Sequence, residues 1–411
     1  MRKVVVTLLL PLLLVTGGCW DQREINDLAM VVATAADVVH EAGNEQVRLT
    51  LQIANPIALV PGQGGGGGGG GPGAPKAFWT VAGTGRTVRA ASLSIVERIP
   101  KPIFFGQDRL TLVGERAARL GITPLLDRPL RNRETRRSMY LAIARGEAKR
   151  VLEVEMPTFR ATGLAISNLF DLEGGRQAIM PVDFGEFAYN LSTGTTSPAA
   201  PVVEVVPQTS ISAEDRKSLG AVPQAIKVSR VAVFSPGGKL VDFFDEKETL
   251  GLMWVLNKIK TREIIVPCPV EGPVEPVVMG LVRSKSRIIV HLEKNGLPSF
   301  EVKVRTTCDL WEHFGTHPGL LTPQYYESLE RRVNTSIERE IMHTVRKAQS
   351  LHADVFGFGE EVKRQHYPEW KRMAQDWPEI FPVVKVTVKA ETGFRHRGLS
   401  VEPVTARKEH R

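Results

Sequence analysis

Cys19 is the residue of this chain whose type and surroundings most clearly predict a chemical modification. It follows two glycines, and before them come two basic residues and the apolar stretch 4–15. A positively charged start, a short apolar core and a small-residue exit are together typical of an export signal. The apolar stretch is shorter than the roughly 20 residues that a membrane-spanning helix needs. We therefore predict that residues 1–18 are a signal peptide and that the body of the protein is exported.

The position of Cys19 resembles a bacterial lipobox, in which the thiol receives a diacylglyceryl group and cleavage makes the cysteine the first residue. Two acyl chains hold a protein stably at a membrane, whereas one chain gives only marginal binding. Thr16 stands where the lipobox usually has leucine. The alternative is a plain signal peptide followed by an unmodified cysteine. We favour the diacylglyceryl anchor and take Cys19 as the predicted lipidation site.

Tests for catalytic and metal chemistry find no site in the sequence. His313 and His317 have the spacing of two metal ligands on one helical turn, but Gly315 and Pro318 oppose a helix there. The run Gly64–Gly71 lacks the Lys-Ser or Lys-Thr that completes a phosphate-binding loop. A Gly-x-Ser-x-Gly nucleophile elbow and a calcium-loop signature are also missing from the sequence. We therefore predict a protein that is not an enzyme and that carries no metal or cofactor.

The other two cysteines leave two interpretations open. Cys268 and Cys308 each flank a run of residues typical of a strand. An exported location permits a disulfide between them. Two buried free thiols fit the same spacing, and the sequence does not choose between these alternatives.

The chain carries a modest excess of positive charge. Its 411 residues include 53 Lys and Arg against 45 Asp and Glu, which gives a net charge of +8. This balance suits an anionic membrane surface or a wall polymer, and it is too small and too scattered to indicate nucleic acid. The densest basic set lies in residues 127–150. That set is either a solvated helical face paired with neighbouring acids, or a contact with anionic lipid headgroups or a partner.

Hydropathy patterns in the first half predict an N-terminal α+β domain at residues 19–192. We expect a short helix near Glu24–Met30, followed by two strands and then a flexible glycine-rich loop at 61–75. The expected strands of this half are 31–38, 46–54, 77–82 and 109–113, and its other expected helices are 87–98 and 115–120. Residues 193–222 are rich in Ser, Thr, Pro and Ala, and we expect a linker or crossing segment there.

The second half predicts a C-terminal α+β region at residues 223–400, with a charged tail at 401–411. A long amphipathic helix is expected at 324–353, because apolar residues recur there every four positions on one face. A break near 296 would divide this region into two subdomains. The strands expected here are 226–234, 240–244, 263–266, 277–282, 287–293, 300–305 and 383–389, and a helix is expected at 246–257. The predicted fold class is α+β, a multi-domain chain with largely antiparallel mixed sheets and packed helices.

Three stretches of the sequence together carry a family resemblance. The first reads Cys-Trp-Asp-Gln-Arg-Glu-Ile-Asn-Asp over residues 19–27. The second comprises Phe105-Gly106-Gln107, Val113-Gly114-Glu115, Arg131, Glu134 and Arg136, and the third comprises Asp354-Val355-Phe356-Gly357-Phe358-Gly359, Tyr367-Pro368-Glu369-Trp370-Lys371, Trp377 and Phe381. In this combination they resemble the Ger(x)C family, the lipoprotein C subunit of GerA-type spore germinant receptors in endospore-forming Firmicutes.

The resemblance implies a non-enzymatic receptor subunit tethered to the outer surface of the spore inner membrane. It would act with an A subunit and a polytopic B subunit in responding to nutrients and triggering germination. The alternative function is a solute-binding lipoprotein of a transporter, a class that usually has two lobes with alternating strands and helices. The sequence itself does not identify the nutrient, nor which subunit binds it.

Three residues beside the anchor are candidate contacts with the membrane or a partner. Trp20 would sit at the level of the lipid headgroups, where amphipathic aromatic side chains are favoured. Asp21 and Glu24 would cap the first helix or pair with a partner subunit.

Overall fold

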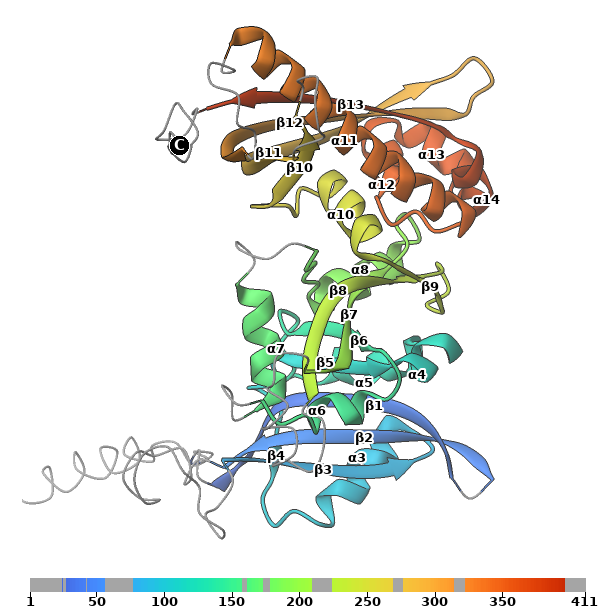
Figure 1. The fold of residues 1–411 in the computed structure, drawn as a ribbon. Helices are drawn as coiled ribbons and strands as arrows, with labels where there is room; N and C mark the ends of the chain where they lie inside the picture. The colour runs from blue at the N-terminus through green and yellow to red at the C-terminus, as the bar shows by residue number, and fades with distance from the viewer. Residues whose placement is uncertain are drawn as a thin grey trace, which may run out of the picture.

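The computed structural model of the chain contains two β-sheets, each with its own helices (Figure 1). It describes residues 24, 27–41, 43–55, 77–156, 161–172, 178–208, 224–268, 276–313 and 322–395. Strands and helices occur in both halves of the chain, which confirms the predicted α+β class. The signal peptide, the glycine-rich loop 61–75 and the tail 401–411 lie outside the described residues.

The larger sheet has the strand order β3-β2-β1-β5-β6-β7-β8-β9, with the short β4 beside β1. Its outer pairs are antiparallel, whereas β1, β5, β6 and β7 run parallel to one another. The strands are β1 (Ala29–Glu41), β2 (Asn44–Ala54), β3 (Phe78–Gly85), β4 (Ile103–Phe104), β5 (Leu110–Gly114), β6 (Tyr140–Ala144), β7 (Ala199–Pro207), β8 (Gln224–Phe234) and β9 (Leu240–Phe244). Parallel neighbours need crossover connections, and helices supply them here.

The helices of this half cover the larger sheet and link its parallel strands. They are α3 (Val88–Val96), α4 (Glu115–Leu120), α5 (Thr123–Arg131), α6 (Ala148–Leu152), α7 (Thr162–Asp171) and α8 (Phe184–Thr193). Helix α3 packs Ala91 and Ile95 on a small core with β1 and β2. The parallel strands β5 and β6 are buried along almost their whole length, as is typical of strands covered on both faces.

The smaller sheet has the order β10-β11-β12-β13 and lies above the larger one in Figure 1. Its strands are β10 (Glu263–Pro267), β11 (Pro276–Leu292), β12 (Pro298–His313) and β13 (Lys385–Phe394). The first three are antiparallel, and β13 is parallel to β12. The helices of this half are α10 (Glu246–Val255), α11 (Pro323–Ser350), α12 (Phe358–Gln365), α13 (Tyr367–Met373), α14 (Trp377–Ile380) and the 3₁₀ turn η2 (Phe381–Val383).

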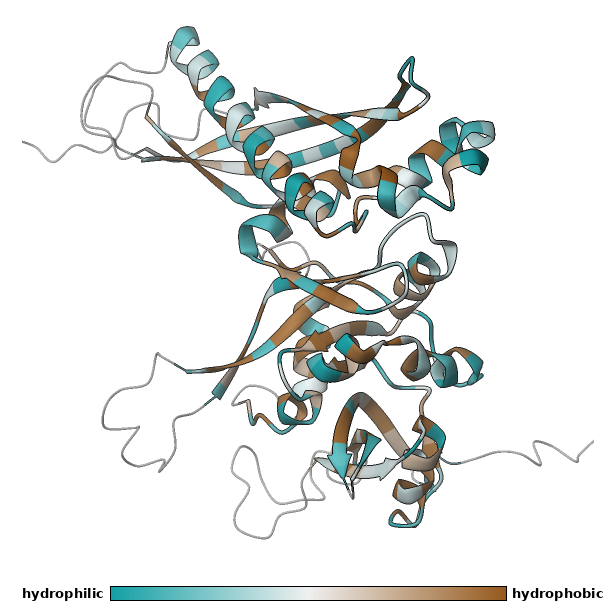
Figure 2. Cartoon of the chain, turned by 90° about the vertical axis from the view of Figure 1, so that its right-hand side faces the viewer, coloured by the Kyte–Doolittle hydropathy of each residue, from teal (hydrophilic) through white to brown (hydrophobic). Residues whose placement is uncertain are grey.

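The long helix α11 confirms the amphipathic helix predicted from the sequence. Its hydrophobic stripe is buried, from Leu329 through Val333 and Ile337 to Val345. Figure 2 shows the same alternation, with hydrophilic and hydrophobic segments following each other along the longest helix. The helix begins where Thr322 accepts a hydrogen bond from the backbone N–H of Tyr325. A threonine cap of this kind satisfies one of the free amides at a helix start.

Helix α10 lies between the two sheets and packs closely against α11 (Figure 1). A Cβ added at Gly251 would collide with Thr344 of α11, so glycine permits this close approach. Trp254 donates its indole N–H to Glu340 at 2.7 Å, and Arg262 pairs with the same carboxylate at 2.6 Å. One hydrophobic core then extends from the larger sheet through α10 to the smaller sheet.

Several expectations about individual elements are wrong. Ala29 and Met30, expected at the end of a helix that begins at Glu24, are the first residues of β1, and residues 25 and 26 lie outside the described part. Within the expected linker 193–222, Ala199–Pro207 is strand β7 of the larger sheet, and residues 209–222 lie outside the described part. The two strands expected at 277–282 and 287–293 form one continuous strand, β11. The division of the chain into domains at 192 and 223 stays a prediction.

Candidate functional site

The residues predicted beside the anchor lie at or before the start of the described chain. Cys19, Trp20 and Asp21 are outside the described residues, so lipidation and membrane contact there stay predictions. Glu24 is exposed, and its backbone carbonyl accepts a hydrogen bond from the N–H of Asp27 at 3.0 Å. Residues 25 and 26 lie outside the described part, so a helix cap at Glu24 stays a prediction, and the chain enters β1 at Ala29.

The third motif stretch folds around the buried carboxylate of Asp354. Oδ1 accepts the backbone N–H groups of Gly357 at 3.0 Å and Phe358 at 3.1 Å. Oδ2 accepts the N–H of Gly359 at 2.7 Å and the indole N–H of Trp377 at 3.1 Å. Three of these donors belong to the turn that begins α12, so Asp354 caps this helix and ties it to α14.

The electrostatics of Asp354 follow from its burial. Its side chain is 3% exposed, and the loss of water raises the pKa of the carboxyl to about 6. The hydrogen bonds from Gly359, Phe358, Trp377 and Gly357 favour the ionised form and oppose that rise. The donors therefore stabilise a carboxylate that burial alone would keep protonated.

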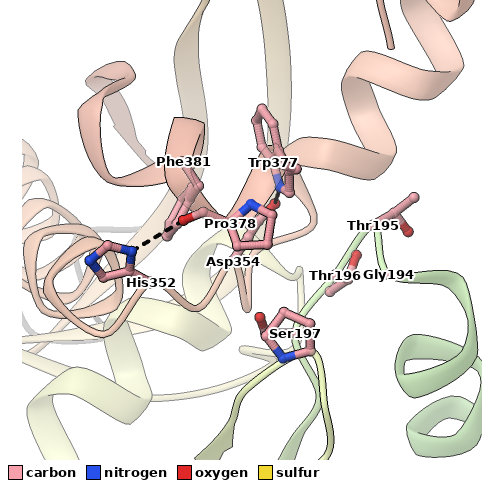
Figure 3. A pocket seen from close by; sticks show the side chains of 10 residues that line it. Gly194, Thr195, Thr196, Ser197, His352, Asp354, Trp377, Pro378 and Phe381 are labelled. Carbon is pink, nitrogen blue, oxygen red and sulfur yellow. Dashed lines mark hydrogen bonds between the residues drawn. The ribbon is translucent and has the colours of Figure 1, made fainter. Parts of the chain in front are cut away.

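The Asp354 turn also joins the second half of the chain to the larger sheet. The backbone N–H of Ser197, just before β7, donates to the carbonyl of Asp354 at 2.7 Å. A Cβ at Gly359 would lie 2.5 Å from the carbonyl oxygen of Thr195, so only glycine allows this contact. Figure 3 shows Asp354 and Trp377 on one side and Thr195 to Ser197 on the other. We call this contact the Asp354 joint: Asp354, Gly357–Gly359 and Trp377 against Thr195–Ser197.

Aromatic side chains of the same motif surround the joint. Trp377 packs edge-on against Trp370, with 5.5 Å between ring centroids. Phe358 stacks on Phe300 of β12 at 4.6 Å. Trp377, Trp370 and Phe358 are all buried, which places these motif residues in the core and not on a contact surface.

The cavity at the Asp354 joint is too small for a ligand. Its volume is about 10 Å³, which is room for about one water molecule. Its lining includes His352, whose Nδ1 lies 3.2 Å from the carbonyl oxygen of Pro378. The joint therefore acts as a packed structural contact between the two halves.

The second motif stretch builds two further contacts in the larger sheet. Glu134 accepts the backbone N–H of Phe105 at 3.3 Å, which brings two separate parts of the motif together. Gly114 leaves room for the carboxylate of Asp37, because a Cβ there would collide with it. Asp37 in turn accepts the N–H groups of Ala148 at 2.7 Å and Lys149 at 2.9 Å.

Asp37 is a buried helix cap that the sequence analysis did not predict. Burial raises the pKa of its carboxyl, while the N–H groups of Ala148 and Lys149 oppose the rise. The signal for it was a single aspartate inside the apolar strand β1. A charge at such a place needs a buried partner, and here the start of α6 supplies it.

A surface hollow of about 600 Å³ opens beside Asp37, between α4 and the end of β1. Its charged lining residues pair with acids of the same region: Arg119 with Glu115 at 2.9 Å and Arg48 with Glu147 at 3.8 Å. These ion pairs leave no unpaired cluster of one sign that would select a ligand.

Two cysteines lie in the part of the chain that the structure describes. Cys268 and Cys308 do not form a disulfide with each other, and burial raises the pKa of Cys308 to about 12. No group of three or more potential metal ligands occurs among the described residues. None of the described helices is long and apolar enough to cross a membrane.

The fold and the site define a class: an α+β protein in which the third motif stretch packs the second half of the chain against the larger sheet. A family model described as "Spore germination protein N-terminal domain" matches residues 21–205, and one described as "Spore germination B3/ GerAC like, C-terminal" matches residues 229–398. Spore germination protein KC of Bacillus subtilis (strain 168) is 26% identical over 411 residues, with 98% of each chain covered. Spore germination protein B3 of the same strain is 26% identical over 391 residues, covering 94% of this chain and 93% of the relative.

A solved structure has a similar fold. The crystal structure of the GerBC protein matches 92% of this chain and 100% of its own, with a TM-score of 0.55 and 20% sequence identity. This structural match shows a similar fold, and the two family models, which together cover most of the chain, show the family. The chain belongs to the Ger(x)C family of spore germination proteins.

Proposed function

We propose that this chain is the lipid-anchored C subunit of a spore germinant receptor and that it works without catalysis. In this role it is needed for the response of the spore to nutrients. The observation that carries the proposal is the match of both germination family models, which between them span residues 21–205 and 229–398. Relatives that align over nearly their whole length bear the names of spore germination proteins.

The roles of the motif residues support a non-catalytic subunit. The two buried carboxylates of the motif contacts, Asp354 and Asp37, are engaged by backbone N–H groups at the starts of helices. A group that works as a general acid or base needs access to a substrate. At the Asp354 joint the free volume is about 10 Å³, so a substrate does not reach the carboxylate.

The anchor and the location complete the proposal. Cys19 carries the diacylglyceryl group, and it places the body at the outer surface of the spore inner membrane. The A subunit and the polytopic B subunit are the partners there. Support comes from the signal-like residues 1–18 and from the short distance of ten residues between Cys19 and Ala29, where β1 begins.

The test is germination of spores in which this receptor is the only intact one. Germination is followed as the loss of optical density, after a nutrient and, separately, after a germinant that bypasses receptors. Deleting the gene should abolish the nutrient response and leave the bypass response unchanged. A deletion strain that answers nutrients as well as wild type contradicts the proposal.

The Cys19→Ala variant separates the anchor from the receptor role. If the anchor matters, this variant should lose the diacylglyceryl group and the nutrient response while the bypass response remains. If only the full deletion shows a defect, the receptor role stands and lipidation is dispensable.

A further inference from the structure

The outer surface of α3 and α5 combines exposed apolar side chains with unpaired arginines. We call it the α3–α5 surface: Arg89, Leu93 and Val96 of α3, Arg128 and Leu130 of α5, and Arg133 and Arg136 of the following loop. Arg128 donates to Ser92 of α3 at 3.3 Å, which fixes the two helices side by side. The motif contact between Glu134 and the backbone N–H of Phe105 lies beside this surface.

Helix α3 carries two exposed apolar side chains on its outer face. Leu93 is 46% exposed and Val96 is 48% exposed, although the helix has a complete buried face of its own at Ala91 and Ile95. Arg89, Leu93 and Val96 follow each other at spacings of four and three, so they share the outer face of the helix. Beyond α3, the surface includes Leu130 of α5 at 40% exposure. An outer helical face of a soluble domain usually carries polar residues instead.

The four arginines of this surface form no ion pairs among the described residues. Arg89, Arg133 and Arg136 are exposed, and none of them forms an ion pair within the described ranges. Arg128 is half-buried over the ring of Phe105 at 5.4 Å, and burial, together with the nearby charge of Arg89, lowers its pKa.

Three carboxylates lie in the same region and reduce the net positive charge of the α3–α5 surface. Asp127 pairs with Arg131 at 2.9 Å, and Glu134 accepts the N–H of Phe105. Glu97 is exposed at the end of α3. The arginines still outnumber these acids, so the surface as a whole attracts anions.

The surface also lies next to the point where the chain joins the sheet. Ala29 pairs with Ile103, and its N–H donates to the carbonyl of Pro102 at 2.9 Å. Phe105 lies two residues after Ile103 in the sequence, and its ring lies under the guanidinium of Arg128. The side chain of Phe105 belongs to the same small core as Ala29. If Cys19 is the membrane anchor, as in the proposed function, ten Cα–Cα steps lead from it to Ala29. Fully extended, they span at most about 35 Å.

We propose that the α3–α5 surface docks on an anionic lipid bilayer and fixes the orientation of the protein on the membrane. Leu93, Val96 and Leu130 enter the interface between headgroups and acyl chains, where apolar side chains are favoured. The arginines bind the negatively charged headgroups. A tether alone sets the distance of the body from the bilayer but leaves its orientation free, and this surface supplies the missing constraint.

Vesicle binding by the mature chain without its lipid tests this surface directly. The probe is the chain from residue 19 carrying Cys19→Ser, which keeps every described element. Binding is measured by co-flotation with vesicles of equimolar phosphatidylglycerol and phosphatidylcholine, and with phosphatidylcholine alone. We expect binding to the anionic vesicles only, weakening as salt is added.

Two sets of variants test whether vesicle binding depends on the α3–α5 surface itself or only on the net charge and general hydrophobicity of the chain. Arg89→Gln, Arg133→Gln and Arg136→Gln together should weaken binding on the order of 100-fold, since each basic residue near an anionic surface contributes roughly 1 kcal/mol. The matched control replaces three exposed arginines of α11, Arg331, Arg332 and Arg339, by Gln. It removes the same charge and should change binding far less.

The apolar pair Leu93→Ser and Val96→Ser should weaken binding about tenfold. Its control, Ile265→Ser with Leu292→Ser, removes side chains of similar exposure from the smaller sheet and should have no effect. The proposal is overturned if the α11 control loses as much binding as the α3–α5 variant, or if neutral vesicles bind equally well. It is also overturned if the folded wild-type chain does not bind anionic vesicles, which would assign this surface to a protein partner. The vesicle assay contains no other receptor subunit, so it tests this surface alone. A negative vesicle result therefore leaves the outcome of the germination test, and with it the proposed function, unaffected.

Discussion

Removing the carboxylate of Asp354 is the sharpest test of how this fold is held together. In the variant Asp354→Ala, four N–H donors lose their acceptor: those of Gly357, Phe358 and Gly359, and the indole N–H of Trp377. All four lie around a side chain that is 3% exposed, where water replaces the lost acceptor poorly. Each buried donor left without a partner costs roughly 1–3 kcal/mol.

The net loss should be smaller than the sum over the four donors. Burial already makes the carboxylate unfavourable, which its raised pKa of about 6 reflects, and the variant removes that cost. We expect Asp354→Ala to lower the free energy of unfolding by about 3–5 kcal/mol, the range seen when one partner of a buried charged network is deleted. That is a large part of the stability of an ordinary domain.

Urea unfolding at pH 7.5, followed by circular dichroism and tryptophan fluorescence, measures this loss. The matched control is Asp376→Ala, an exposed aspartate at the start of α14 whose side chain makes no capping hydrogen bond. Surface changes of this kind usually stay within about 0.5 kcal/mol. If Asp354→Ala is no less stable than Asp376→Ala, the assignment of Asp354 as the centre of the joint is refuted.

Three further outcomes are expected from the buried groups. Burial raises the pKa of Asp108 to about 7, so the protonated carboxyl stabilises the fold below pH 4 and this stabilisation is lost as the pH rises through 7. The free energy of unfolding of Asp108→Asn, measured with urea and taken relative to wild type, should therefore increase over that range by at most about 4 kcal/mol. A difference that does not change with pH would contradict this. Gly359→Ala places a Cβ 2.5 Å from a carbonyl oxygen and should cost about 1–3 kcal/mol in the same assay, whereas Gly393→Ala meets nothing within 4 Å and serves as the control. Cys268 is half-buried and should react with iodoacetamide in the folded protein, whereas Cys308 should react only after unfolding, as read by mass spectrometry of the peptides; rapid native labelling of Cys308 would contradict its burial.

The elements that the sequence predicted well are those whose pattern is local. Helix α11 carries its apolar stripe over 28 residues, and the stripe alone indicates a helix with one buried face. Strand β2 alternates apolar and polar residues, and it too was expected. In both cases the signal lies within one short window of the chain.

The errors fall where partners distant in sequence decide the structure. The helix expected at 24–30 fails at its end because Ala29 and Met30 pair with Ile103 and Phe104 of β4, a contact that no local pattern encodes. Strands β6 and β7 are buried apolar runs without alternation, so their periodicity carried no strand signal.

Prediction of the candidate site was limited in the same way, because its residues come from distant parts of the sequence. The sequence singled out Asp354 and Trp377 as parts of one motif, but not as hydrogen-bonded partners. They are 23 positions apart, and the third element of the joint, Ser197, lies in the other half of the chain. Residue types alone could not tell a buried cap from a ligand site, because that distinction depends on the volume left around the carboxylate.

The central claim is that this chain works as one subunit of a membrane receptor, and isolation of the assembly from spores tests it most directly. An affinity tag after Arg411, beyond the described residues, allows the protein to be purified from detergent-solubilised spore inner membranes. Mass spectrometry should then find the proposed A and B subunits in amounts comparable to this chain, and it should not find them in a control preparation made without the tag. Recovery of the tagged chain from the inner membrane without either subunit, under conditions that keep another receptor intact, would contradict the claim.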